Sequence, residues 1–150
     1  MSITPLGSTT VTQIGIIVRN LEDVAQAWAR LLGLPVPKII VTEPGKLTQA
    51  EYQGQPTPAR AKLAFFQLGQ VALELIEPIG EPSTWQDQLI RHGQSLHHIA
   101  FEVKGIAERL TVLAEQGLPV IQRGEYRGGR YAYLDGQQQY GAIVELLEND

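Results

Sequence analysis

The spacing of apolar residues along the chain predicts strands and helices in an order that occurs twice. A helix is expected where apolar residues recur every three or four positions, and a strand where β-branched residues are dense or alternate with polar ones. The elements predicted in the first half are the strand Val11–Val18, the helix Leu21–Leu32, the strand Val36–Val41 and the hairpin strands Ala61–Leu68 and Gln70–Ile76. Glu43–Ala59, with several glycines and prolines, is predicted to be a long loop.

The second half is predicted to repeat this plan after a short connecting helix, Thr84–His92, which Ser83 can cap. The elements predicted there are the strand Leu96–Val103, the helix Ile106–Gln116, the strand Val120–Arg123 and the strand pair Tyr131–Leu134 and Ala142–Leu147. A turn-rich loop is expected over Gly124–Gly129.

The two halves align with each other at their first and last strands. Gln13–Val18 matches His98–Val103, and Val71–Leu75 matches Ala142–Leu146. We therefore predict one domain of the α+β class, built from two pseudo-symmetric βαβββ modules. Module one covers about residues 11–78, the linker helix about 83–93 and module two about 96–148.

The strand Leu96–Val103 carries two adjacent histidines. Because neighbouring side chains of a strand point to opposite faces, His97 should share the core face of Ile99, while His98 should point the other way beside Ala100. One structural histidine and one exposed histidine would account for this pair. Histidine is also the commonest metal ligand, so His98 is a candidate ligand if further donors converge on it.

The repeat supplies those donors. Gln13 is the equivalent of His98, and Glu74 is the equivalent of Glu145. Each glutamate lies within an otherwise apolar strand, where an unpaired buried carboxylate is costly. Either glutamate alone could face solvent, but the matched set predicts a divalent cation bound by Gln13, Glu74, His98 and Glu145.

Composition restricts the kinds of partner. The net charge of −4 argues against a general nucleic-acid binder, which needs clustered Lys and Arg. The absence of cysteine leaves only nitrogen and oxygen ligands for a metal. No apolar run approaches the ~20 residues of a membrane span. Met1–Thr10 is expected to be an irregular N-terminal segment. It lacks the basic start and apolar core of a signal peptide, so a cytoplasmic protein is expected.

Three stretches resemble the vicinal oxygen chelate superfamily, which includes glyoxalase I, methylmalonyl-CoA epimerase, extradiol dioxygenases and bleomycin- and fosfomycin-resistance proteins. They are Leu73–Pro78, His92–Phe101 and Gly141–Leu146, whose sequences are most similar to those of methylmalonyl-CoA epimerases. The resemblance implies a half-open barrel around a divalent ion (Zn, Co, Ni or Mn), with Gln13, Glu74, His98 and Glu145 as its ligands. It also implies a homodimer.

The resemblance implies an isomerase or lyase acting next to a carbonyl group of an acyl-CoA, thioester or keto compound. Glu145 is the expected base and Glu74 the facing acid or base. Alternatives are a glyoxalase I-like enzyme, a non-catalytic small-molecule-binding or resistance protein and, less favoured, a ring-cleaving dioxygenase. Candidate substrate-binding residues are Arg60, Arg130, Tyr131 and Tyr133, although the tyrosines could equally pack within strands and the arginines could be solvated.

The chain departs from the related enzymes at three positions. Gln13 stands where epimerases have histidine, which makes the ligand set similar to that of animal-type glyoxalase I. Pro58 stands where epimerases have a second catalytic glutamate, so Glu43 or Glu51 would have to replace it. Ile17 stands where glyoxalase I has a glutathione-binding arginine.

Overall fold

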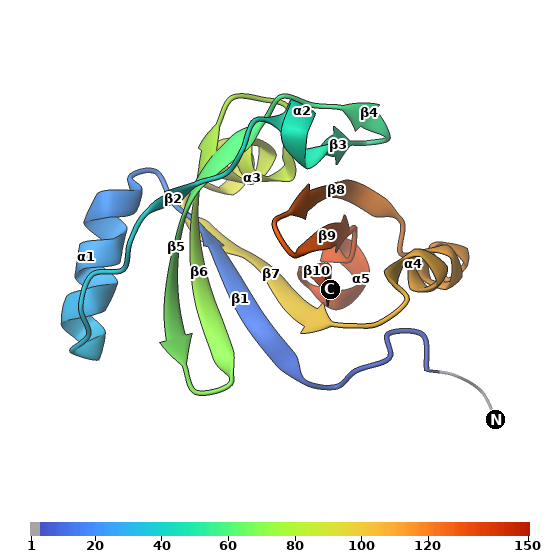
Figure 1. Cartoon of the computed structure of the whole chain (residues 1–150), viewed down its shortest axis with the longest axis horizontal. Coiled ribbons are helices and arrows are strands. Elements are labelled where there is room, and N and C mark those ends of the chain that lie inside the picture. The colour runs from blue at the N-terminus through green and yellow to red at the C-terminus, as the bar shows by residue number, and fades with distance from the viewer. Residues whose placement is uncertain (1–3) are drawn as a thin grey trace.

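The computed structural model describes residues 4–150, in which ten strands form one mixed sheet (Figure 1). The elements, in chain order, are β1 (Val11–Ile17), α1 (Leu21–Leu32), β2 (Ile40–Val41), α2 (Gly45–Thr48), β3 (Glu51–Tyr52), β4 (Gln55–Pro56), β5 (Arg60–Leu68), β6 (Val71–Ile79), α3 (Thr84–His92), β7 (Ser95–Glu102), α4 (Ile106–Glu115), β8 (Val120–Tyr126), β9 (Gly129–Leu134), α5 (Gln137–Tyr140) and β10 (Ile143–Asn149). Residues 1–3 of the predicted irregular N-terminal segment lie outside the described residues.

The strand order shows the internal repeat directly. The sheet runs β2-β5-β6-β1-β7-β10-β9-β8-β3-β4, so the first strands of the two halves, β1 and β7, are neighbours, and they are antiparallel to each other. β1 pairs in parallel with β6, as β7 does with β10. The sheet curls into a half-barrel, with α1 outside one end and α4 outside the other (Figure 1). The predicted α+β class is thus confirmed, while the module boundaries at residues 78 and 96 stay a prediction.

The helices begin and end where their capping residues predict. Asn20 caps α1 by accepting a hydrogen bond from the Asp23 amide at 3.0 Å, and Gly33 ends it with φ 68°. Ser83 caps α3 by accepting from the Gln86 amide at 3.0 Å. The predicted bounds of both helices agree with the structure. In residues 4–150, none of the helices has the length and apolar character needed to span a bilayer.

Helices α1 and α4 cover the convex face of the sheet, and one set of strand side chains packs against them. Ala64, Phe66, Leu73 and Leu75 join the buried cluster that contains Leu21, Ala25 and Ala29 of α1. Leu146 joins an equivalent cluster with Leu113 of α4. Because side chains alternate along a strand, Glu74 and Glu145 point to the opposite, concave face.

Two predicted loops are wrong in part. Residues 43–59 contain α2 and the β3–β4 hairpin, and β3 pairs with β8 of the second half. The predicted loop Gly124–Gly129 shrinks to Arg127 and Gly128, because β8 continues to Tyr126. The predicted strand Val36–Val41 is reduced to β2. The first correction reflects pairing of β3 with the distant strand β8, and the second reflects pairing of β8 with β9 across a tight turn. Glycine and proline content reveals neither pairing.

Candidate metal centre

The four predicted donors lie on four adjacent strands, β6, β1, β7 and β10, in two neighbouring rows across the concave face. In one row, Gly15 lies between Glu74 of β6 and His98 of β7. In the next row, Ala100 lies between Gln13 of β1 and Glu145 of β10. Gly15 has no side chain and Ala100 has only a methyl group, so the long side chains on either side of them can converge.

A β-bulge overturns the expected orientation of His97, whereas His98 shares a face with Ala100 as expected. The register of β1 with β7 shifts between Gly15 and Ile16, which pair with His98 and Leu96, so His97 is an extra residue. Such a bulge interrupts the alternation of faces. His97 and His98 are consequently both buried, at 1% and 2% exposure, and their Nδ1 atoms lie 2.9 Å apart. Ile99, expected in the core, is 38% exposed instead.

The donor atoms meet around the His98 ring. His98 Nε2 lies 3.0 Å from Glu145 Oε1 and 3.4 Å from Glu74 Oε1. Gln13 Oε1 lies 3.0 Å from the same nitrogen. With its amide turned over, Gln13 would donate from nitrogen to Glu145 Oε1 at 2.8 Å and to Glu74 Oε1 at 3.1 Å. The structure therefore brings all four predicted side chains together.

These separations fit a cation. Ligand atoms about 2.0–2.2 Å from a metal lie about 3.3–3.6 Å apart in a tetrahedron and about 2.9 Å apart in an octahedron. A cation between these atoms would let the Gln13 oxygen face the two carboxylates, whereas in its absence the turned amide donates to both of them. One amide, two carboxylates and one imidazole form a set of nitrogen and oxygen donors suited to Zn, Co, Ni or Mn. The residues present thus fit a divalent ion.

The electrostatics of the cluster point the same way. Burial lowers the pKa of His98, but the charges and hydrogen bonds of Glu145 and Glu74 outweigh burial and raise that pKa to about 10. Burial raises the pKa of Glu145, although the charge of His98 opposes it. Burial, together with the charge of His98, holds the pKa of His97 well below its ordinary value. Without a metal, a proton on His98 offsets the charge of one of the two carboxylates, whereas a divalent cation could neutralise both.

A largely apolar cavity of about 590 Å³ lies over the cluster. Gln13, Glu74 and Glu145 line it, and its walls also include Leu63, Phe65, Trp85, Tyr131, Tyr133 and Leu147. Glu43 and Arg127 also line it, whereas Glu51 forms an ion pair with Arg123, with Arg123 Nε 3.2 Å from Glu51 Oε1. Of the two candidates to replace the missing glutamate, Glu43 is therefore the one that faces the cavity.

The four candidate substrate-binding residues divide into two groups. Tyr131 and Tyr133 line the cavity. Arg60 Nε donates to the Thr42 carbonyl at 3.0 Å, and Arg130 pairs with Glu148 at 3.0 Å and with Asp150, so both arginines lie outside the lining. Sequence reasoning missed Trp85, whose Nε1 donates to the Tyr133 hydroxyl at 3.0 Å.

The chain is similar to known proteins over most of its length. Residues 12–133 match the family model described as the glyoxalase/bleomycin resistance protein/dioxygenase superfamily. The chain belongs to this superfamily. A relative in it is the uncharacterized protein YqjC of Bacillus subtilis (strain 168), 33% identical over 138 residues, which cover 90% of this chain and 89% of YqjC. The predicted family resemblance is thereby confirmed.

Solved structures with this superfamily's fold include a hypothetical protein of Bacillus halodurans C-125. It is 27% identical, with a TM-score of 0.67 and 94% of each chain covered. Methylmalonyl-CoA epimerase of Streptomyces coelicolor, in complex with 2-nitronate-propionyl-CoA, is 22% identical, with a TM-score of 0.64 and 94% of each chain covered. At 22% identity, the similarity to this epimerase shows a shared fold and carries no statement about a shared activity.

Proposed function

We propose that this chain is a divalent-metal-dependent enzyme that moves a proton at the carbon next to a carbonyl group. The observation that carries the proposal is the pair of buried glutamates. Glu74 and Glu145 come from equivalent strands of the two halves, both lie within 3.4 Å of His98 Nε2, and both line the cavity. A reaction that removes a proton and returns it can use one carboxylate for each transfer.

Gln13, Glu74, His98 and Glu145 would hold the cation. When bound, a divalent ion supplies Lewis-acid stabilisation of negative charge on a substrate oxygen. Glu145 acts as the base, because a carboxylate that loosens from the cation has an oxygen free to accept a proton. Glu74 faces the substrate from the other half and returns the proton. The apolar walls exclude water from these transfers.

The activity we favour is that of a methylmalonyl-CoA epimerase-like enzyme on an acyl-CoA or related thioester. The epimerase fold of the Streptomyces coelicolor neighbour, whose complex holds a propionyl-CoA derivative, supports this choice. Glu43 then takes the place of the glutamate that Pro58 replaces, since Glu43 lines the cavity. The expected homodimer and cytoplasmic location remain predictions. Light scattering on the purified protein tests the dimer.

A glyoxalase I-like activity is the second candidate, favoured by Gln13 at the first ligand position. Ile17 is fully buried at the position where glyoxalase I binds glutathione through arginine, which weakens this candidate. A non-catalytic binding protein is the third, and the mostly apolar walls of the cavity would suit it. The convergence of four donors favours the enzyme.

The test is exchange of the α-proton with D₂O solvent for methylmalonyl-CoA and related thioesters, with Co²⁺ or Mn²⁺ added. We expect exchange with the wild type and its loss in Glu145→Gln. Glu115→Gln, which removes an exposed carboxylate at the end of α4, is the matched control and should exchange normally. No exchange with the thioesters, and no turnover of the methylglyoxal–glutathione adduct, would remove both named activities.

A further inference from the structure

A buried hydrogen-bonded chain runs from the proposed metal ligand His98 to the start of α3. His98 Nδ1 lies 2.9 Å from His97 Nδ1, and His97 Nε2 lies 3.2 Å from the Thr84 hydroxyl. His97, His98 and Thr84 are 1%, 2% and 5% exposed. The predicted pair of histidines thus forms one connected unit, and the role of its first member is left open by the proposed reaction.

The direction of each bond follows from the chemistry of imidazole. If His98 offers the Nε2 lone pair to a cation, its proton must be on Nδ1. A bond between two Nδ1 atoms needs one donor and one acceptor, so His97 Nδ1 accepts. The proton of neutral His97 is then on Nε2, which donates to the Thr84 hydroxyl oxygen. Each of these nitrogen and oxygen atoms thus has one consistent role, as a hydrogen-bond donor or as an acceptor.

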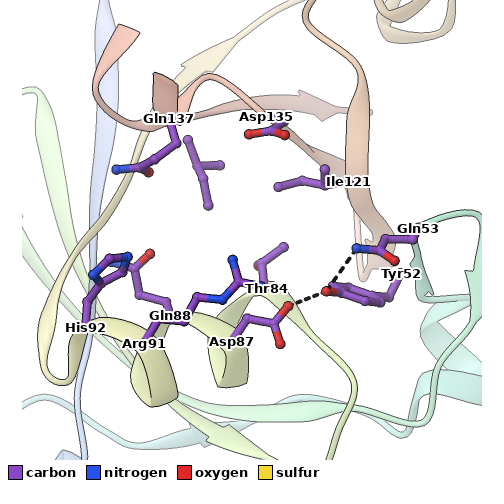
Figure 2. A pocket seen from close by; sticks show the side chains of 11 residues that line it. Tyr52, Gln53, Thr84, Asp87, Gln88, Arg91, His92, Ile121, Asp135 and Gln137 are labelled. Carbon is purple, nitrogen blue, oxygen red and sulfur yellow. Dashed lines mark hydrogen bonds between the residues drawn. The ribbon is translucent and has the colours of Figure 1, made fainter. Parts of the chain in front are cut away.

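The far end of this chain is held in place. The Thr84 amide donates to Oε1 of Gln122 at 2.8 Å, and Gln122 is 1% exposed. The ring of Tyr133 packs edge-on against His97, with centroids 5.0 Å apart. Thr84 also lines a second, smaller pocket of about 170 Å³, near Asp87 and Tyr52 (Figure 2). Thr84 therefore contacts the buried histidines and also lines this pocket.

We propose that His97 is a positioning residue that, anchored by Thr84, fixes the tautomer and the orientation of His98. The proposal rests on the proposed function, because it takes Nε2 of His98 as a ligand. Partners that accept the second N–H of a ligating histidine orient the ring and strengthen the ligand, and their loss typically weakens metal binding by about 10–100-fold. Here a neutral imidazole plays the part usually taken by a carboxylate or a backbone carbonyl.

The test uses the full chain and Co²⁺ as the probe, with dissociation constants measured by calorimetry. His97→Phe should bind Co²⁺ about 10–100-fold more weakly than the wild type. His97→Asn should restore most of the affinity, because its Oδ1 can accept from His98 Nδ1. Thr84→Val should weaken binding, and Thr84→Ser, which keeps the hydroxyl, should not. Equal affinities of the wild type, His97→Phe and Thr84→Val overturn the proposal.

Nitrogen-15 NMR of the imidazole rings in the metal-free protein gives an independent result. We expect the His97 proton on Nε2 and a proton on His98 Nδ1. A His97 proton on Nδ1 would overturn the proposal, whether or not any variant folds. A wild type that binds no Co²⁺ refutes the proposed metal-dependent function instead, so the two failures can be told apart.

Discussion

Replacing Gly15 by alanine tests the packing that places His98. A Cβ at Gly15 would lie 2.1 Å from Cε1, 2.4 Å from Nδ1 and 2.6 Å from Nε2 of His98. Ordinary carbon contacts are about 3.5–4.0 Å, so the ring would have to retreat by more than about 1 Å. The rings of His97 and Tyr133 lie behind it, with centroids 5.1 Å and 5.2 Å away. These two rings oppose that movement.

The expected cost of Gly15→Ala is about 1–3 kcal/mol of folding stability, as for other insertions into a packed core. In a chain of this length each kcal/mol lowers the melting temperature by about 2–4 °C. The displaced imidazole also leaves the carboxylates of Glu74 and Glu145. We expect the affinity for Co²⁺ to fall by at least about 10-fold, as it does when the orientation of a ligand is lost.

The assay compares thermal unfolding and Co²⁺ calorimetry of Gly15→Ala with those of Gly33→Ala. Gly33 ends α1 with φ 68°, and an added Cβ there meets nothing within 4 Å. The left-handed backbone should cost this control about 1–2 kcal/mol without touching the cluster. Gly33→Ala should therefore lose stability and keep its Co²⁺ affinity. Wild-type stability and affinity in Gly15→Ala would refute the packing argument.

Two further outcomes are expected. The pKa of His98 is raised to about 10 in the metal-free protein, so Nε2 carries a proton at neutral pH that a cation must displace. Zn²⁺ affinity should therefore rise with pH up to about pH 10, and calorimetry in buffers of different ionisation enthalpy should detect about one released proton, whereas no buffer dependence would contradict this. Asn20→Ala removes the hydrogen bond to the Asp23 amide and should cost about 1 kcal/mol in urea unfolding, with Co²⁺ binding unchanged.

The parts of the fold that local sequence could predict are those that local chemistry decides. The bounds of α1 follow from Asn20, the apolar spacing and Gly33, and those of α3 from Ser83 and Gly93. The β3–β4 hairpin was missed because its strands are two residues long and β3 is held by pairing with β8, far along the chain. Such pairing leaves little trace in the spacing of apolar residues.

In the candidate site, too, some features follow from the sequence and others depend on how distant strands pair. Matching the halves was enough to select Gln13, Glu74, His98 and Glu145, because a carboxylate within an apolar strand stands out against its neighbours. The bulge at His97 was not predictable, since it depends on how β7 pairs with β1. Strict alternation therefore separated two histidines that in fact contact each other.

The most direct measurement is diffraction from crystals grown with Zn²⁺, with data collected on both sides of the zinc absorption edge. We expect one anomalous peak about 2.0–2.2 Å from Gln13 Oε1, His98 Nε2 and oxygens of Glu74 and Glu145. The absence of a peak among these atoms, with the Gln13 amide nitrogen turned toward the two carboxylates, would contradict the metal centre and the function proposed from it.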